Sequence, residues 1–253
     1  MIYDVQKASM WKRMSAWLLD VILLAVLAVG LGALISMLTG YDNYNQQLLD
    51  CYDRYESLYS VEFDVNQEQW DAMSEEAQQR YTQAYEAMVA DEEVMRVYNM
   101  VISLMLVSVS VSFLVAYLAL EFAVPLVLKN GQTLGKKVFS LGLMRSDGVR
   151  VTPFMLFVRT VLGKYTIETM IPALIVLMIF FGTVGVVGPA IVLVLLVVQL
   201  IMLAVTRHNT AIHDFISHTV VVDLSSQMIF DTPEDLIAYK QKIAAEKAAK
   251  QTY

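Results

Sequence analysis

Long apolar stretches alternate with polar ones along the chain and predict four membrane-spanning helices. The predicted spans cover residues 14–38, 99–128, 166–182 and 187–206. A helix needs about 20 predominantly apolar residues to cross a hydrocarbon core about 30 Å thick, and each stretch approaches or exceeds that length. The pattern therefore predicts an all-α membrane protein built on a four-helix transmembrane bundle.

The last two spans come from one apolar run over residues 165–206, which is too long for a single crossing. Three glycines and a proline interrupt this run near its middle: Gly182, Gly185, Gly188 and Pro189. They favour a tight turn between two helices. The alternative is one long tilted helix, which would place the C-terminus on the opposite side of the membrane.

A different pattern occupies residues 39–98, between the first two spans. Apolar and aromatic residues recur there at helical spacing in two sets. The first set is Tyr41, Tyr44, Leu48, Cys51, Tyr52, Tyr55, Leu58 and Tyr59, and the second is Trp70, Met73, Ala77, Tyr81, Ala84, Tyr85 and Met88. Asp64, Val65 and Asn66 separate the sets, which predicts an antiparallel helical hairpin. Its Tyr/Met stripe is interpreted as an internal seam rather than a ligand site.

Charge is segregated along the chain in a way that predicts the orientation of the spans. Residues 39–98 carry 14 acidic and 3 basic side chains and no lysine, whereas the rest of the chain carries 15 basic and 11 acidic side chains. Segments rich in Lys and Arg stay in the cytoplasm. The hairpin is therefore expected to be extracytoplasmic and both termini cytoplasmic, with Lys7, Lys129 and Arg207 among the flanking basic residues.

These boundaries divide the chain into six segments. They are the cytoplasmic N-terminus with the first span (1–38), the acidic hairpin (39–98), the second span (99–128), a basic cytoplasmic segment (129–164), the third and fourth spans (165–206), and a cytoplasmic strand with a C-terminal helix (207–253).

The basic cytoplasmic segment is expected to hold a small β-hairpin followed by an amphipathic helix. Residues 138–144 and 149–152 flank an Asp147-Gly148 turn signal. Residues 218–224 could add a third strand. Apolar and basic residues after Pro153 then predict an interfacial helix that lies on the inner leaflet and ends near residue 164.

The composition supports an integral membrane protein, because 57% of the 253 residues are hydrophobic and only 17% are charged. The lipid bilayer is the expected surrounding, and neither a nucleic-acid partner nor a cofactor is expected. Cys51 is the only cysteine, which excludes an intramolecular disulfide. It is interpreted as a small residue on a helix face, with a reactive or dimer-linking thiol as the alternative.

Ionisable residues in or near the spans are the candidate functional residues. The set comprises Arg13, Asp20, Glu121, Glu168 and Asp214, with Arg159 and His213 in support and His208 nearby. A charge as deep as Asp20 costs roughly 2.5–3.5 kcal/mol on insertion and usually faces a partner or a wet cavity. Arg13, two helical turns earlier, is its predicted counter-charge. Glu121 is expected at a similar depth, where two carboxylates could share a proton or bind a cation. The alternative is a structural ion-pair network.

A glycine-rich segment, Gly131-Gln132-Thr133-Leu134-Gly135-Lys136-Lys137, invites comparison with a phosphate loop. A Walker motif needs four residues between its glycines and a Ser or Thr after the Lys, and both are missing. The segment is therefore interpreted as a tight cytoplasmic turn, formed by Gly131, Thr133, Gly135 and Lys136, near anionic headgroups.

The remaining polar residues predict neither a metal site nor an enzyme. His208, His213 and His218 recur every five residues, a spacing that suits zinc poorly on one helix face. No nucleophile–base arrangement is visible in the sequence.

Several of these pieces together resemble the RDD family of membrane proteins, which is named for one arginine and two aspartates. The resemblance is carried by residues 12–20, 131–137, 141–143, 147–148, Arg159, 211–215 and 219–221. Arg13, Asp20 and Asp214 correspond to the naming residues. The resemblance covers residues 8–38 and 99–223, leaves the hairpin of 39–98 as an insertion, and is broken at His218, where a small residue is common. It implies a bacterial inner-membrane protein, and the family is often suggested to transport solutes.

Two hypotheses follow from the sequence. The first is a transporter of a cation or small solute, in which Asp20 and Glu121 are proton or cation sites and Arg13 tunes their pKa. Four spans are few for a permeation path, so a homo-oligomer accompanies this hypothesis. The second is a non-enzymatic interaction or regulatory subunit whose acidic hairpin binds an extracytoplasmic or membrane protein partner.

Overall fold

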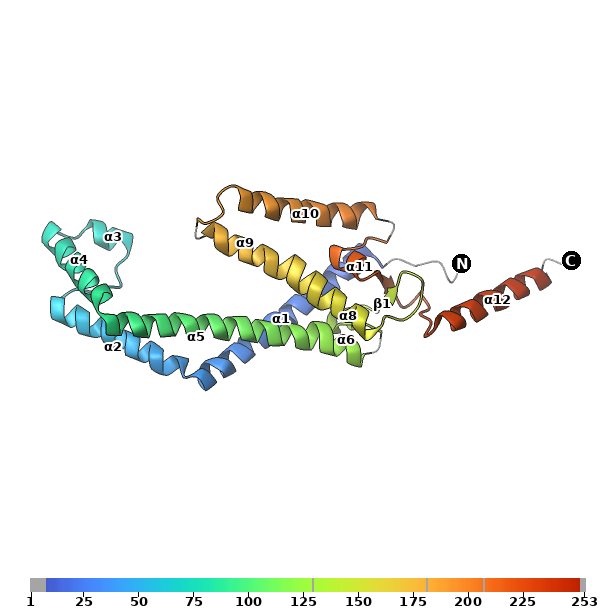
Figure 1. Cartoon of the computed structure of the whole chain (residues 1–253), viewed down its shortest axis with the longest axis horizontal. Helices are drawn as coiled ribbons and strands as arrows, with labels where there is room; N and C mark the ends of the chain where they lie inside the picture. The colour runs from blue at the N-terminus through green and yellow to red at the C-terminus, as the bar shows by residue number, and fades with distance from the viewer. Residues whose placement is uncertain (1–7, 129, 181, 207, 251–253) are drawn as a thin grey trace. The chain divides into compact units, whose positions relative to one another are not determined.

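The computed structural model describes residues 8–128, 130–180, 182–206 and 208–250, and its helices and strands follow one another as labelled in Figure 1. The elements are α1 (Met10–Thr39), α2 (Tyr41–Tyr59), α3 (Gln67–Asp71), α4 (Glu75–Ala90), α5 (Glu92–Tyr117), η1 (Leu118–Ala123), α6 (Val124–Val127), α7 (Leu134–Val138), β1 (Leu141–Arg145), α8 (Pro153–Phe157), η2 (Val158–Met170), α9 (Ile171–Phe180), α10 (Val187–Val205), α11 (Ile212–Ile216), β2 (Thr219–Asp223) and α12 (Pro233–Lys250). η1 and η2 are π-helical.

The chain forms two compact units. The first unit contains Met1–Ala25 and Ala116–Tyr253, and the second contains Val26–Val115. The boundaries fall inside α1 and α5. Lys7, Lys129 and Arg207, which entered the orientation argument, lie outside the described residues.

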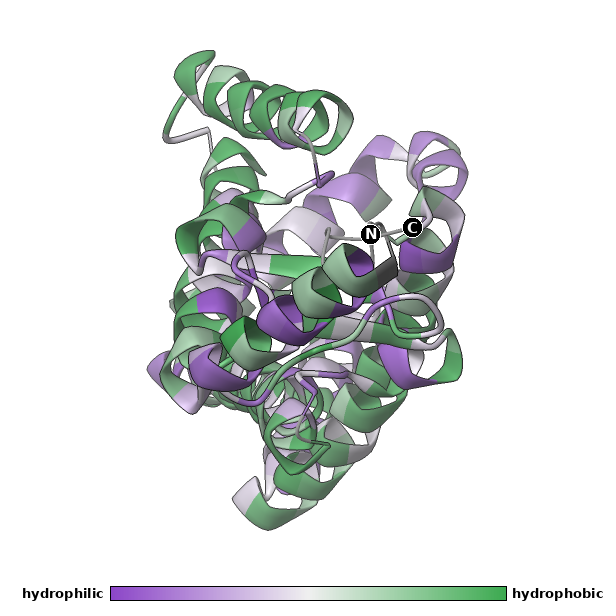
Figure 2. Ribbon diagram, turned by 90° about the vertical axis from the view of Figure 1, so that its right-hand side faces the viewer, coloured by the Kyte–Doolittle hydropathy of each residue, from purple (hydrophilic) through white to green (hydrophobic). Residues whose placement is uncertain are grey.

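Four helices are long and apolar enough to cross a membrane, which confirms the four predicted spans. They are Met10–Thr39, Glu92–Val127, Pro153–Phe180 and Val187–Val205. Large apolar side chains along them are exposed, as expected for surfaces that face lipid rather than water. Figure 2, coloured by hydropathy, shows hydrophobic residues (green) over much of the helical ribbon.

The third of these helices corrects the predicted interfacial helix. A separate amphipathic helix ending near residue 164 was wrong, because α8, η2 and α9 form one uninterrupted helical segment. The charged residues that suggested a surface helix, Arg159 and Lys164, instead find carboxylate partners within the protein. The charges of Arg159 and Lys164 are therefore neutralised within the protein, without water or lipid headgroups.

The small sheet differs from the predicted β-hairpin. β1 pairs antiparallel with β2, from Leu141 opposite Asp223 to Arg145 opposite Thr219, so the predicted third strand is the main partner. The Asp147-Gly148 turn does form, but only an isolated bridge joins Met144 to Arg150 beyond it. Thr152 then caps α8 and Pro153 lacks the N–H that a strand would require. The hairpin prediction was correct for the turn and wrong for the strand pair.

The first unit is organised around this sheet. Its buried cluster joins Leu141, Leu143 and Val221 of the strands to Ala16 of α1 and Leu156 of α8. Because α1 contacts the sheet through this cluster, the polar face of α1 is fixed next to the α7 turn and β1.

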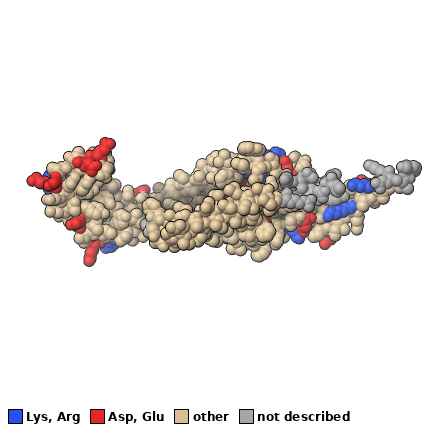
Figure 3. Space-filling model, turned by 90° about the horizontal axis from the view of Figure 1, so that it is seen from above, with Lys and Arg blue, Asp and Glu red and all other residues tan. Residues whose placement is uncertain are grey.

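The second unit contains the predicted helical hairpin, in which α2 packs on α4. Gly40 (φ 72°) separates α1 from α2, and Ser74 caps α4 by accepting a hydrogen bond from the Ala77 N–H. Leu48 and Met88 are buried with tyrosines of α2 around them, so the predicted Tyr/Met seam is internal. Figure 3 shows acidic side chains gathered over this hairpin.

Candidate functional site

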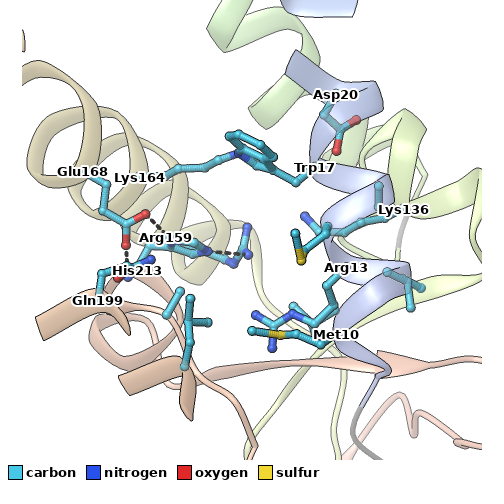
Figure 4. Close-up of a pocket in the computed structure, with 16 residues that line it drawn as sticks. Met10, Arg13, Trp17, Asp20, Lys136, Arg159, Lys164, Glu168, Gln199 and His213 are labelled. Carbon is cyan, nitrogen blue, oxygen red and sulfur yellow. Dashed lines mark hydrogen bonds and ion pairs between the residues drawn. The ribbon is translucent and has the colours of Figure 1, made fainter. Parts of the chain in front are cut away.

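The candidate site is a pocket of about 340 Å³ in the first unit. Its lining combines α1, from Met10 to Asp20, with η2, from Arg159 to Glu168, and with Gln199 and Leu203 of α10. Residues of α7, β1, α11 and β2 complete it. Figure 4 shows Lys136 extending from one side of the pocket and Arg159 and Lys164 from the opposite side.

Asp214 binds both arginines of the candidate set. Its carboxylate accepts hydrogen bonds from Arg159 Nε at 2.9 Å and from Arg13 Nη2 at 3.3 Å. Arg13 also donates to the Asn209 carbonyl. Asp214 is only 1% exposed. Burial alone would raise the pKa of Asp214, but the neighbouring positive charges, chiefly that of Arg159, together with the hydrogen bond from Arg159 outweigh burial and hold that pKa well below its ordinary value.

Asp20 binds the glycine-rich turn rather than Arg13. One carboxylate oxygen accepts from the Thr133 hydroxyl at 2.5 Å and the other from the Gly135 N–H at 2.8 Å. Thr133 in turn caps α7 by accepting from the Lys136 N–H at 3.3 Å. The predicted Arg13–Asp20 ion pair was therefore wrong. The Asp20 carboxylate accepts hydrogen bonds from a hydroxyl and a backbone N–H, and Arg13 donates to Asp214 instead.

Gly135 has to be a glycine at this contact. A Cβ on Gly135 would lie 2.2 Å from the Ala16 carbonyl oxygen and 2.9 Å from the Asp20 carboxylate. The turn can thus approach α1 only because position 135 has no side chain. Gly131 has φ 60°, a left-handed conformation that glycine adopts without strain. Gly131 and Thr133 of the predicted turn precede α7, whereas Gly135 and Lys136 lie in its first turn, and the segment binds Asp20.

Glu121 has a partner of its own. Its Oε1 lies 2.5 Å from Lys164 Nζ, and its side chain is 5% exposed. The Thr160 hydroxyl donates to the Glu121 backbone carbonyl at 3.1 Å, which ties η1 to η2. No described residue binds Glu121 Oε2. Asp20 and Glu121 therefore interact with different partners and do not form the predicted carboxylate pair.

His213 connects η2 with α11. Glu168 accepts from the His213 N–H at 2.8 Å and lies 2.7 Å from Nδ1, while Arg159 Nη2 lies 2.9 Å from Nε2. A guanidinium can only donate, so Nε2 must accept and the proton must reside on Nδ1, from which it is donated to Glu168. Burial is the main reason that the pKa of His213 is lowered, and the charge of Arg159 acts in the same direction. The geometry thus holds a neutral imidazole of one tautomer.

Lys136 differs from the other three cations of the pocket. No described residue forms a hydrogen bond or an ion pair with its ammonium group. Burial, followed by the nearby charge of Arg159, lowers the pKa of Lys136 to about 7.

Lys164, Glu168 and Gly163 were not assigned these roles from the sequence. Glu168 follows Arg159 by nine positions, which in an α-helix is about two and a half turns, so the two side chains would point to opposite sides. The i→i+5 pattern of π-helical η2 widens each turn and brings them to one pocket. Gly163 lets α11 approach, because a Cβ there would lie 2.7 Å from His213 Cβ. The sequence had marked Glu168 only as an ionisable residue near a span, and Gly163 was visible only as a glycine inside a predicted helix.

The described residues contain no group of three or more His, Cys, Asp or Glu side chains suited to a metal ion. Among comparisons with known proteins, the sequence profile of the RDD family matches residues 7–218, which is most of the chain. No curated protein and no solved structure gave a significant match. The matched region includes Arg13, Asp20 and Asp214, and every residue that lines the pocket except Val221.

Proposed function

Because this chain belongs to the RDD family and is a multi-pass membrane protein, we propose that it binds a small solute in the pocket and moves it across the membrane. The observation that carries the proposal is the lining itself. Three of the four candidate spans contribute to it, and both charged and apolar side chains line a volume in the range of small-molecule sites. The role proposed is binding and movement, without chemistry on the solute.

The ion pairs around the pocket support a solute rather than a cation bound by Asp20 and Glu121. Both of these carboxylates already have donors within the protein, at 2.5 to 2.8 Å. A cation at Asp20 would have to displace these donors, and a cation at the remaining oxygen of Glu121, Oε2, would be repelled by the Lys164 ammonium group on Oε1. In this proposal the carboxylates position α7 and η2 and thereby shape the pocket.

Blocking the pocket tests the proposal. The full chain is reconstituted into proteoliposomes, and currents on a solid-supported membrane are recorded after addition of benzoate, benzylamine, inorganic phosphate or sodium. We expect at least one of these to produce a current that Leu203→Trp abolishes, because Leu203 lines the pocket. Leu200→Trp is the matched control, since Leu200 is an exposed residue of the same helix that does not line the pocket.

Currents that are absent for every solute, or that are equal in the two folded tryptophan variants, would overturn the proposal. The oligomeric state in nanodiscs then decides whether one chain or a homo-oligomer provides the path.

A second candidate function is partner binding by the hairpin. Apolar side chains, among them Leu49, Leu58 and Tyr85, are exposed between its acidic residues. Replacing residues 42–96 by a short Gly/Ser linker should abolish capture of an extracytoplasmic partner and leave the pocket-dependent current intact. A lost current with unchanged capture would contradict this second function.

A further inference from the structure

The charges that line the pocket are predominantly positive. Arg13, Lys136, Arg159 and Lys164 line it, against the carboxylates of Asp20 and Glu168. Two further carboxylates, those of Asp214 and Glu121, bind these cations from positions that do not line the pocket. A ligand inside the pocket therefore meets more positive than negative groups.

The two lining carboxylates have no oxygen left without a donor. Both oxygens of Asp20 accept hydrogen bonds from the α7 turn. Both oxygens of Glu168 bind His213, one through its backbone N–H and the other through its ring. A cationic ligand would have to compete with these donors and would also be repelled by the ammonium group of Lys136.

Three of the lining cations are bound to protein acceptors, and Lys136 is the exception among the described residues. Arg13 and Arg159 bind Asp214, and Lys164 binds Glu121. A cation that is withdrawn from water without a counter-charge is destabilising, and an anion brought to it recovers that free energy. Burial and the charge of Arg159 lower the pKa of Lys136 although Glu121 and Asp20 act in the opposite direction, so these carboxylates do not compensate for its burial.

The remainder of the lining is largely apolar. Met10, Met14 and Trp17 of α1 lie on one side, and Leu203 of α10 also lines the pocket. Such a lining favours an apolar body beside the anionic group, and an aromatic ring would suit the Trp17 indole. Inorganic anions would leave this part of the pocket without a complementary surface.

We propose that the pocket binds a small amphipathic anion, whose carboxylate or phosphate pairs with Lys136 and whose apolar body lies against Trp17, Met14 and Leu203. This deepens the proposed function by naming the class of solute, and it rests on that function only for transport, not for binding. The anion can come from a free organic acid or from the headgroup of an anionic lipid.

Binding to the full chain in phosphatidylcholine nanodiscs tests the proposal. Benzoate, benzyl alcohol and benzylamine share one ring and differ in charge, and inorganic phosphate has charge without the ring. By isothermal titration calorimetry we expect benzoate to bind at least tenfold more tightly than the other three. Benzylamine binding as tightly as benzoate, or no benzoate binding to folded protein, would overturn the proposal.

Two neighbouring lysines provide matched variants. Lys136→Met should weaken benzoate binding at least tenfold, and Lys136→Arg should retain it within a few-fold. Lys137→Met is the control, because Lys137 is exposed and does not line the pocket. Equal benzoate affinity in Lys136→Met and Lys137→Met would contradict the role of Lys136. If Lys136→Met does not fold, the comparison of benzoate with benzylamine on the unaltered chain still decides the outcome.

The two sources of the anion are separated by lipid composition. If a lipid headgroup occupies the site, phosphatidylglycerol in the nanodisc weakens benzoate binding to the unaltered chain but not the residual binding to Lys136→Met. If a free organic acid occupies it, phosphatidylglycerol has no effect. Failure of this proposal is distinguishable from failure of transport: anion binding without any current contradicts only transport, and a pocket-dependent current of benzylamine or sodium contradicts only the anion.

Discussion

Gly135 and Asp20 form a close contact that fixes the position of Lys136 at the pocket. The turn before α7 approaches α1 so closely that its backbone N–H reaches the Asp20 carboxylate at 2.8 Å. Each of the three naming residues of the family thus has a structural partner. Arg13 binds Asp214, and Asp20 binds the turn that carries Lys136. At the scale of residues, these ion pairs and hydrogen bonds hold in place the charged side chains that line the pocket.

Gly135→Ala should destabilise the protein strongly. The added Cβ would lie 2.2 Å from the Ala16 carbonyl oxygen, a backbone atom that cannot move aside alone. Overpacking of this kind costs about 3 kcal/mol. Thermal unfolding in detergent should show a large decrease in Tm. Gly30→Ala is the control, because nothing lies within 4 Å of a Cβ at that position of α1, and its Tm should be unchanged or higher. Similar Tm values for the two variants would contradict the close approach.

His213→Gln should reduce the loss of stability in mild acid. Burial lowers the pKa of His213 below its ordinary value of 6.5, so below pH 6.5 the unfolded chain takes up a proton that the folded chain does not. The unfolded state then binds more protons, and stability falls as the pH falls. One such proton contributes at most about 1.4 kcal/mol per pH unit.

A glutamine at position 213 can accept from Arg159 and donate to Glu168 without titrating. The measurement is Tm between pH 7.5 and pH 5.5 for both proteins. An equally steep decrease in the variant would show that His213 is not held neutral.

At the scale of elements, the π-helical segment η2 decides which side chains share the pocket. Two threonine hydroxyls follow its i→i+5 pattern, since Thr166 donates to the Val161 carbonyl and Thr169 to the Lys164 carbonyl, both at 2.8 Å. These bonds add to the backbone pattern that places Arg159, Lys164 and Glu168 on one side.

Replacing both threonines by valine should therefore weaken the segment and the pocket together. Valine keeps the shape of threonine and removes the donor, at about 1 kcal/mol for each hydrogen bond. We expect a lower Tm and weaker benzoate binding in Thr166→Val/Thr169→Val. Thr82→Val is the matched control, because the Thr82 hydroxyl donates to the Gln78 carbonyl on an exposed face of α4. Unchanged Tm and binding in the double variant would mean that the backbone alone maintains the π-helical pattern.

The elements show which features the sequence could predict. Hydropathy located all four spans, and the spacing of tyrosines and methionines located the hairpin. The Asp147-Gly148 turn was also predicted, because its signal is local. The strand that pairs with β1 was predicted as a possible third strand over residues 218–224, but it is distant in sequence, and nothing local indicates that it replaces residues 149–152 as the main partner of β1.

At the scale of the whole molecule, sequence reasoning singled out charged residues in and near the spans but assigned them the wrong interaction partners. Depth along separate helices suggested that Asp20 and Glu121 interact. Whether two side chains pair depends instead on the side of the helix from which each one projects. From the sequence, that side was judged by α-helical spacing, and the π-helices η1 and η2 depart from this spacing. From the sequence, Lys136 was placed in a surface turn. The turn instead approaches α1, and it can do so because position 135 is a glycine. Such a close approach leaves no pattern in hydropathy, so the sequence did not indicate that Lys136 lines a pocket.

The orientation in the membrane is a prediction of the charge distribution that single cysteines can test. The hairpin region 39–98 has no lysine and 14 acidic residues, whereas α12 carries several lysines, so the positive-inside rule places the hairpin outside the cell membrane and α12 in the cytoplasm. Cys51 is a poor reporter, because it is half-buried and burial raises the pKa of its thiol.

We therefore choose exposed positions on a Cys51→Ser background, Gln79→Cys on α4 and Glu246→Cys on α12. A membrane-impermeant maleimide should label Gln79→Cys in intact spheroplasts and Glu246→Cys only after permeabilisation. The reverse pattern would place the acidic hairpin in the cytoplasm and contradict an extracytoplasmic partner. It would not affect the anion site, because the pocket lies in the first unit and does not include the hairpin.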